Sequence, residues 1–281
     1  MAQPGKDSLW RFAPSPNGYL HLGHAFSALS NEAAAQKSGG RLLLRIEDID
    51  STRCRPHFEQ AIYEDLAWLG LAWEQPVRRQ SAHRADYADG LDRLKRAGLV
   101  YPCFCTRSDI ARAAGENAPR DPDGARLYPG TCRALSAHER AARLARGDKA
   151  AWRIDMAKAL AGRPPLAWLE HGAPHAAEPA LWGDALIARK DIATSYHLAV
   201  VVDDAVQGVS DVMRGADLLQ ATALHRLLQD KLALPAPRYW HHALLRDESD
   251  AKLSKSRLSK SLRDWRAEGA SPQDIRRMLG F

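Results

Sequence analysis

Residues 10–24 read Trp-Arg-Phe-Ala-Pro-Ser-Pro-Asn-Gly-Tyr-Leu-His-Leu-Gly-His, and this stretch decides the interpretation of the fold. Its first four residues alternate in polarity, and the Pro-Ser-Pro-Asn-Gly run that follows must interrupt any regular element. From His21 to Lys37 the chain is rich in Ala and Leu, and it then reaches Gly39 and Gly40, where glycine can take a positive φ and end a helix. The pattern predicts a strand, a tight turn and a helix, the beginning of an α/β nucleotide-binding fold.

Later segments extend the α/β pattern and interrupt it once. The apolar run 42–46 predicts a buried parallel strand, and residues 47–50 supply acidic groups at its carboxyl end, where ligands bind. A second α/β stretch is expected, with residues 196–204 as a buried strand and a helix from Asp217. A further strand is predicted over 242–245. Residues 101–133 are rich in Cys, Gly and Pro, and predict an insertion that splits the sheet.

Length and composition exclude several classes of protein. The 281 residues are 45% hydrophobic, so the chain can bury a core and is not globally disordered. The longest aliphatic run, residues 198–202, is far shorter than the ~20 apolar residues that a membrane span requires. Residues 1–11 contain no apolar segment of an export signal, so we expect a cytoplasmic protein. The net charge of +6 suits a polyanionic partner, but it is equally compatible with ordinary solubility.

The motif His21-Leu22-Gly23-His24 opens the first predicted helix. Two imidazoles three positions apart share one helix face, and Gly23 leaves room for a ligand to approach the backbone. Free N–H groups at a helix N-terminus favour a phosphate group. The motif therefore indicates a phosphate-binding turn, and the alternative is two surface histidines on a capped helix.

A second candidate for phosphate binding is Lys252-Leu253-Ser254-Lys255-Ser256. Two flexible ammonium groups in a loop can close over a triphosphate and neutralise the charge that builds up when pyrophosphate leaves. Ser259-Lys260-Ser261 repeats part of this pattern, so either Lys255 or Lys260 could be the functional lysine. We favour the first copy because it carries both lysines and lies closer to the predicted strand end.

Together, H-L-G-H at 21–24 and K-L-S-K-S at 252–256 resemble the two signature motifs of class I aminoacyl-tRNA synthetases. Residues 11–21 and 45–53, the latter reading R-I-E-D-I-D-S-T-R, narrow the resemblance to the glutamyl subgroup. Only 25 residues follow Ser256, so we expect no anticodon-binding domain. The short form with a cysteine-bearing insertion is similar to the glutamyl-Q tRNA(Asp) synthetase family.

The resemblance implies a Rossmann-type catalytic domain whose parallel sheet is split by a zinc-binding insertion. We expect the first half of the nucleotide-binding domain over 1–100 and an inserted acceptor-like subdomain over 101–194. The second half is then expected over 195–245, and a lysine loop with a short C-terminal helical segment over 246–281.

The resemblance also implies the site residues. The catalytic residues would be His21, His24, Lys252 and Lys255, and ATP would be bound by His21, Gly23, His24 and Lys255. The glutamate site would comprise Arg11, Ala13, Ser15, Glu47, Tyr196 and Arg214. The guanidinium groups of Arg11 and Arg214 can each donate two hydrogen bonds to a carboxylate of glutamate, and the carboxylate of Glu47 can pair with its ammonium group. The alternatives are a surface arginine at a helix entry for Arg214, and an acid paired with Arg45 for Glu47.

A metal site is implied by Cys103, Cys105, Cys132 and Tyr128, as three thiolates and a tyrosine oxygen around one structural Zn²⁺. Zinc can organise a loop-rich insertion that lacks a core. His138 is the alternative fourth ligand, and three reduced thiols without metal are the other possibility. Cys54 is expected to be a plain thiol.

The activity implied by the resemblance is ATP-dependent, Mg²⁺-assisted activation of L-glutamate that needs no tRNA, followed by transfer to queuosine at the wobble position of tRNA(Asp). A monomer without membrane contact is expected. One alternative is glutamylation of the 3′ end of tRNA(Glu). The other is a non-catalytic, synthetase-derived RNA-binding module, which intact signature motifs argue against.

Overall fold

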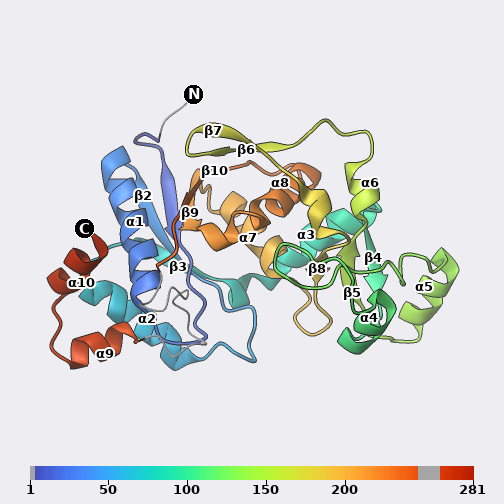
Figure 1. Cartoon of the computed structure of the whole chain (residues 1–281), viewed down its shortest axis with the longest axis horizontal. Coiled ribbons are helices and arrows are strands. Elements are labelled where there is room, and N and C mark those ends of the chain that lie inside the picture. Colours follow the sequence, from blue (N-terminus) through green and yellow to red (C-terminus); the bar gives the residue numbers. More distant parts are fainter. Residues whose placement is uncertain (1–3, 246–259) are drawn as a thin grey trace.

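The computed structural model describes residues 4–245 and 260–281. A seven-stranded sheet with the order β3-β2-β1-β9-β10-β6-β7 forms its centre (Figure 1). All neighbouring pairs are parallel except β6 and β7, which form a hairpin. The mainly parallel α/β class predicted from the sequence is therefore confirmed. The strands are β1 Leu9–Phe12, β2 Arg41–Ile46, β3 Glu74–Arg79, β6 Ala167–Glu170, β7 Ala173–Ala176, β9 Asp211–Gly215 and β10 Arg238–His242.

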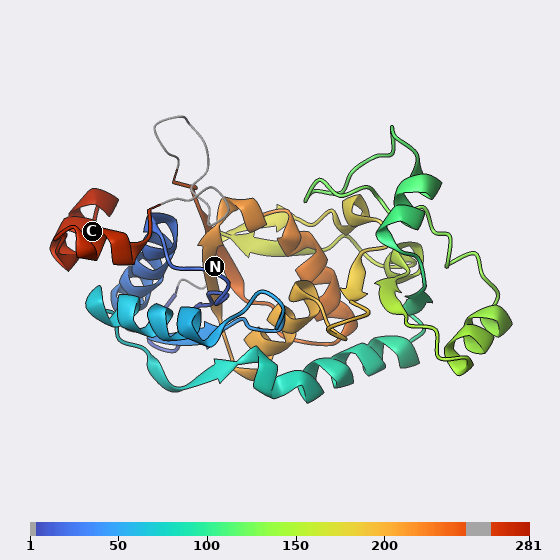
Figure 2. The same ribbon diagram turned by 90° about the horizontal axis from the view of Figure 1, so that it is seen from below.

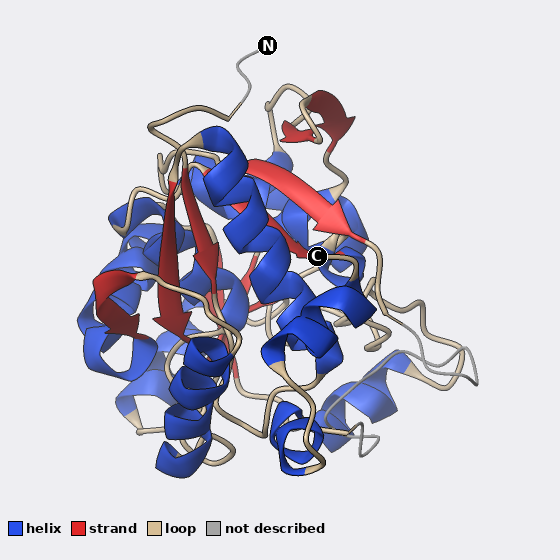
Figure 3. Ribbon diagram, turned by 90° about the vertical axis from the view of Figure 1, so that its left-hand side faces the viewer, coloured by secondary structure: helices blue, strands red, loops and turns tan. Residues whose placement is uncertain are grey.

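Helices cover both faces of this sheet (Figure 3). The first, α1, begins immediately after His21 and ends at Gly39, whose φ of 65° allows the terminal turn. This agrees with the helix predicted from residues 21–40. Pro56 occupies the first turn of α2, as expected from its fixed φ. The helices around the sheet are α1 Leu22–Ser38, α2 Pro56–Trp68, α3 Arg84–Arg96, α7 Tyr196–Val206 and α8 Ala221–Lys231.

Two strand predictions in the second half of the chain are wrong. Residues 196–204 form helix α7, which Ser195 caps by accepting a hydrogen bond from the backbone N–H of Leu198. Residues 198–204 are all buried, so the segment has no polar face to reveal its helical period. The strand predicted at 242–245 lies earlier, because β10 ends at His242. The strands of this second half are β9 and β10, and α8 follows β9 after a short 3₁₀ turn, Ala216–Leu218.

The cysteine-bearing region folds around its own antiparallel sheet, with the order β4-β5-β8, at the end of the molecule opposite α10 (Figure 1). Helix α3 runs along one side of the molecule toward β4 (Figure 2). The elements are β4 Val100–Cys103, β5 Ala151–Ile154, β8 Leu186–Ala188, α4 Arg107–Ala114, α5 Ala137–Ala145 and α6 Met156–Leu160. Hairpin β6-β7, by contrast, joins the main sheet. The division at residues 100, 194 and 245 remains a prediction.

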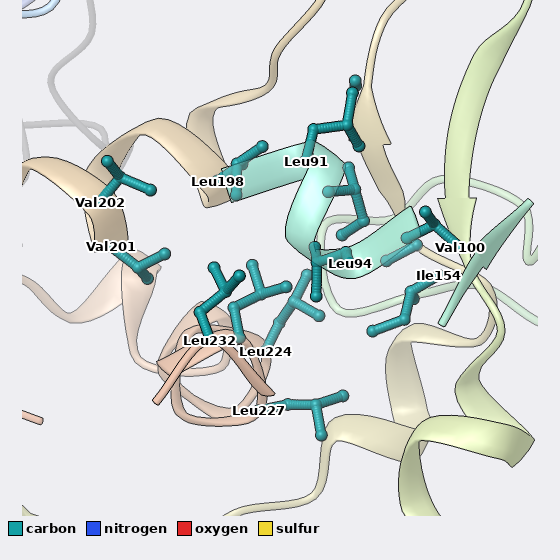
Figure 4. Packing of buried hydrophobic residues seen from close by; sticks show 14 of the residues in the cluster. Leu91, Leu94, Val100, Ile154, Leu198, Val201, Val202, Leu224, Leu227 and Leu232 are labelled. Atoms are coloured by element: carbon teal, nitrogen blue, oxygen red, sulfur yellow. The ribbon is translucent and has the colours of Figure 1, made fainter. Parts of the chain in front are cut away.

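Apolar packing connects the two sheets. The largest buried cluster includes Leu94 of α3, Ile154 of β5, Leu198 of α7 and Leu224 of α8 (Figure 4). These four side chains are all fully buried, so α3, α7 and α8 bind the antiparallel sheet to the rest of the fold through the hydrophobic effect.

The C-terminal helices α9 Leu262–Ala267 and α10 Pro272–Leu279 lie beside α1 and α2 (Figure 1). Ile275 is fully buried there, and Arg276 donates hydrogen bonds to the carbonyl oxygen of Leu69 and pairs with Glu32. The predicted short helical segment is thus present. Lys252 and Lys255 lie outside the described residues. Within those residues, no helix has the length and apolarity needed to span a membrane.

Candidate active site

A cavity of about 880 Å³ opens at the carboxyl end of the parallel sheet, between β1, β2, β9 and the start of α1. Its lining contains all the residues that the sequence predicted for glutamate, together with the H-x-G-H turn. They come from segments as far apart in the sequence as Arg11 and Arg214, and the topology of the sheet brings their ends to one edge. The predicted residues that line it are Arg11, Ala13, Ser15, His21, Gly23, His24, Glu47, Tyr196 and Arg214.

The two histidines form a compact turn at the start of α1. Nδ1 of His21 accepts a hydrogen bond from the N–H of Gly23 at 3.0 Å, and Nδ1 of His24 accepts one from the N–H of His21 at 3.2 Å. The ring centroids lie 3.9 Å apart. Since each Nδ1 accepts, each neutral ring carries its proton on Nε2, where it can donate to a ligand. A Cβ on Gly23 would lie 2.9 Å from Cε1 of His21, so a larger residue at this position would displace the His21 ring.

The chain on either side of residues 246–259 lies at the same cavity. Leu244 and Leu245 are part of its lining. On the other side, Ser261 forms an isolated antiparallel bridge with His21, and the N–H of Leu262 donates to the carbonyl oxygen of Leu20 at 2.8 Å. The described residues Ser261 and Leu262 therefore lie next to the H-x-G-H turn, and Lys252 and Lys255 precede them in the sequence.

Lys260, the alternative loop lysine, is engaged elsewhere. Its ammonium group pairs with Glu268 and lies 3.6 Å from the centroid of the Trp265 ring. Lys260 does not contribute to the described lining of the cavity. Its neighbour Ser261 caps α9 through a reciprocal hydrogen-bond pattern with Asp264. The second Ser-Lys-Ser copy thus has a structural explanation.

Arg11 and Glu47 belong to a buried ionic network below the cavity. Asp204 of α7 accepts from Arg11 at 3.2 Å and from Arg45 at 2.7 Å, and Arg45 also pairs with Glu47 at 3.3 Å. The alternative reading of Glu47 as a partner of Arg45 is thus correct, although Glu47 also lines the cavity. Burial raises the pKa of Glu47, an effect that Arg45 and Arg11 partly offset.

Arg214 differs from Arg11 in having only neutral partners. It is 5% exposed at the end of β9, so the alternative of a surface arginine is wrong. Its guanidinium donates to Nε2 of His241, the hydroxyl groups of Tyr196 and Thr222, and Nδ1 of His225. Among residues 4–245 and 260–281, no carboxylate lies within 4.0 Å of it. A buried guanidinium without an anion is costly and suits a ligand carboxylate.

Sequence reasoning missed the partners that hold these arginines. Asp204 was assigned to a strand, and no motif contains His225, His241 or Thr222. The only local signal was that the acidic pair at 203–204 follows an apolar run, which is unusual in a buried segment.

Three of the four cysteines meet in the small sheet region. The Sγ atoms of Cys103, Cys105 and Cys132 lie within 4.8 Å of one another. The hydroxyl of Tyr128 lies 3.4 Å from Sγ of Cys105 and accepts from the N–H of Cys132 at 2.8 Å. Clustered soft thiolates suit Zn²⁺, with one further oxygen ligand available. Burial raises the pKa of Cys105 to about 11, so metal binding would have to displace its proton.

The other residues considered for this site do not join it. Cys54 lies outside the cluster, near the carbonyl oxygen of Glu47 at the active-site cavity, and His138 is not part of any described metal-ligand group. Of the two fourth ligands considered, Tyr128 has a described contact with the thiol cluster, through its hydroxyl and Sγ of Cys105.

This fold and this cavity define the catalytic domain of a class I tRNA synthetase. The family model for class I tRNA synthetases (E and Q), catalytic domain, matches residues 9–280, and the chain belongs to that family. By this membership the protein is an enzyme of the ligase class. Several relatives of similar length share one name. The glutamyl-Q tRNA(Asp) synthetase of Rhodobacter capsulatus is 46% identical, over 96% of this chain and 99% of the relative.

Other relatives are longer. The glutamate–tRNA ligase 2 of Nitrosococcus oceani is 38% identical, over 94% of this chain but 57% of its own length. Among solved structures, the glutamate-tRNA synthetase of Elizabethkingia anophelis superposes with a TM-score of 0.75 at 27% identity. The superposition covers 94% of this chain and 54% of that chain, so this chain spans about half the length of that synthetase. A methionyl-tRNA synthetase from Mycobacterium tuberculosis shares the fold, with a TM-score of 0.59 at 13% identity.

Proposed function

We propose that this protein activates L-glutamate with ATP in the absence of tRNA and transfers the glutamyl group to queuosine at the wobble position of tRNA(Asp). The observation that carries the proposal is the meeting, in one cavity, of the H-x-G-H turn and the buried Arg214, which has no acidic partner among the described residues. Relatives that carry the name glutamyl-Q tRNA(Asp) synthetase at 38–46% identity support the choice of acceptor.

In the first step, an oxygen of the α-carboxylate attacks the α-phosphorus of ATP, and the bond to the β-phosphate oxygen breaks. The Nε2–H groups of His21 and His24 would donate to the phosphates, and Lys255 would neutralise the leaving pyrophosphate. Lys252 would close the same loop over the nucleotide. Mg²⁺ bound with ATP would supply further charge neutralisation. No side chain is needed as a nucleophile, so catalysis rests on position and charge.

The glutamate would be held at three points. Its reacting α-carboxylate must face the phosphates. Arg214 pairs with no described carboxylate and donates to the Tyr196 hydroxyl at 3.3 Å, so it suits the side-chain carboxylate. Glu47 would bind the ammonium group. Arg11 and the small residues Ala13 and Ser15 would complete the wall near the α-carboxylate.

In the second step, a hydroxyl of the queuosine cyclopentenediol attacks the acyl carbon, and AMP leaves with the former carboxylate oxygen. Zn²⁺ bound by Cys103, Cys105, Cys132 and Tyr128 would stabilise the insertion and take no part in this chemistry. We expect a cytoplasmic monomer, whose basic surface contacts the RNA backbone in a salt-dependent manner.

The activation step is tested by exchange of labelled pyrophosphate into ATP with glutamate and without tRNA. Exchange is expected, and its absence would refute activation. The acceptor is tested by comparing three RNAs, tRNA(Asp) with queuosine, tRNA(Asp) without it, and tRNA(Glu). Label is expected on the first alone. Label on tRNA(Glu) would support the alternative of 3′-end charging.

The two candidate lysines can be separated by matched variants. Lys255→Gln is expected to lower kcat for exchange by at least about 100-fold, a typical loss when a group that stabilises developing charge is removed. Lys260→Gln is expected to change kcat by less than about threefold, because Lys260 pairs with Glu268. The reverse order would assign the role to Lys260.

A further inference from the structure

The described groups that accept hydrogen bonds from the guanidinium of Arg214 carry no charge. Nε donates to Nε2 of His241 at 3.1 Å, and one Nη group donates to the Thr222 hydroxyl at 2.8 Å. Both Nη groups lie 3.3 Å from Nδ1 of His225. Thr222 and His225 are at most 1% exposed and His241 is 9% exposed, so water cannot substitute for these acceptors.

The tautomer of His241 is set by a carboxylate behind it. Since Nε2 accepts from Arg214, the ring proton must be on Nδ1, which donates to Glu170 at 2.8 Å. Glu170, in β6, also accepts from the backbone N–H of His241 at 2.9 Å and from the indole N–H of Trp168 at 2.9 Å. Burial opposes its ionisation, but these hydrogen bonds lower the pKa of Glu170 to about 2. The acid therefore orients His241 and lies on the side of the ring away from Arg214.

The tautomer of His225 is likewise determined by its two hydrogen-bond partners, Arg214 and His197. Its Nδ1 faces Arg214, so its proton is on Nε2, which donates to Nδ1 of His197 at 3.1 Å. Burial and the nearby Arg214 lower the pKa of both rings, to about 4 for His197. The groups that face His225 are thus Arg214, His197 and the Tyr196 ring, with no acid among the described neighbours.

We propose that His225 and His241 are positioning residues that determine specificity for a substrate carboxylate, because they hold Arg214 without neutralising it. A carboxylate in this shell would satisfy Arg214 and remove its preference for an anionic ligand, as Asp204 does for Arg11. A neutral acceptor keeps the Arg214 guanidinium in place, and the positive charge of that group remains available to pair with the ligand carboxylate. Glutamate then gains a charged pair that glutamine, with a neutral amide, cannot form. This inference rests on the proposed glutamate site.

The test compares two variants of the same shape. His225→Asn keeps a neutral oxygen acceptor near the position of Nδ1, whereas His225→Asp adds one negative charge there. Pyrophosphate exchange is measured with glutamate, glutamine and ATP as the varied substrates. His225→Asp is expected to raise the KM for glutamate and to lower the preference for glutamate over glutamine at least about tenfold, equal to about 1.4 kcal/mol. His225→Asn is expected to stay within about threefold of the wild type, and the KM for ATP should not change in either variant.

The outcomes are separable. Equal preference in both variants, or a parallel rise in the KM for ATP, would overturn the inference, because a merely structural role does not depend on one charge. If His225→Asp does not fold, His241→Gln and His241→Met provide a second pair. Gln retains an acceptor near the position of Nε2 and should preserve the KM for glutamate, while Met should raise it. Absence of exchange in the wild type would instead refute the proposed function.

Discussion

Asp204→Asn removes one charge from the most deeply buried part of the site. The carboxylate joins Arg11 and Arg45, and all three side chains are at most 5% exposed. Breaking a buried ion pair by removing one partner costs about 3–5 kcal/mol. Arg45 keeps contacts with Asp203 and Glu47, and Asn retains one acceptor oxygen, so we expect the lower end, about 3 kcal/mol.

This free-energy change converts into a measurable temperature. At about 2.1 cal/mol/K per residue, 281 residues give an unfolding entropy of about 590 cal/mol/K. A loss of about 3 kcal/mol then lowers Tm by about 5 °C. The matched control is Asp191→Asn, whose 2.7 Å pair with Arg189 is 54% and 32% exposed and should contribute less than about 1 kcal/mol.

The assay is thermal unfolding followed by circular dichroism and calorimetry at pH 7. Burial opposes ionisation of Asp204, but Arg11 and Arg45 hold its pKa below the ordinary value. The stabilisation is therefore complete above the unfolded pKa of about 3.9 and is lost as the pH falls further, so the two proteins should converge in acid. Equal Tm values for Asp204→Asn and Asp191→Asn would refute the reasoning.

Three further predictions concern the metal, the pH dependence and the H-x-G-H turn. Cys105→Ser should reduce bound zinc, measured by atomic emission, from one ion per chain to nearly none and lower Tm, whereas Cys54→Ser should keep one; equal zinc contents would contradict the site. The pKa of His197 is about 4 in the folded protein, so the unfolded chain takes up a proton at this residue at a higher pH than the folded chain does. The free energy of unfolding in urea should therefore fall between pH 6.5 and 4, and it should fall less in His197→Asn. Identical pH profiles for the two proteins would contradict this. Gly23→Ala should displace the His21 imidazole and slow pyrophosphate exchange at least about tenfold. In the control Gly5→Ala, the new Cβ would have no atom within 4 Å, so the exchange rate should not change. Equal rates for the two variants would show that the turn tolerates a Cβ.

Sequence reasoning succeeded where the signal was local. The helix after His21 was predicted because its N-terminal turn and its terminal glycine are both encoded within twenty residues. The thiol cluster was predictable because the spacing of Cys103 and Cys105, with a third cysteine downstream, is itself a local pattern. The strand at 42–46 had a short apolar run between polar boundaries, which a buried parallel strand favours.

It failed where tertiary context decides. Residues 198–204 are buried on every side as a helix, so periodicity could not distinguish helix from strand. The environment of Arg214 could not be deduced either, because Glu170, His225 and His241 lie on β6, α8 and β10 and come together only in the folded chain. A guanidinium that is buried among neutral groups leaves no pattern in the sequence.

The most direct test of the account is mass spectrometry of the wobble nucleoside of tRNA(Asp) from cells with and without this protein. We predict that glutamyl-queuosine is present in the first sample and is replaced by unmodified queuosine in the second. Restoring the wild-type chain should return the modification, and Arg214→Gln should not. Equal amounts of glutamyl-queuosine in both samples would contradict the central claim that this cavity activates glutamate for transfer to that base.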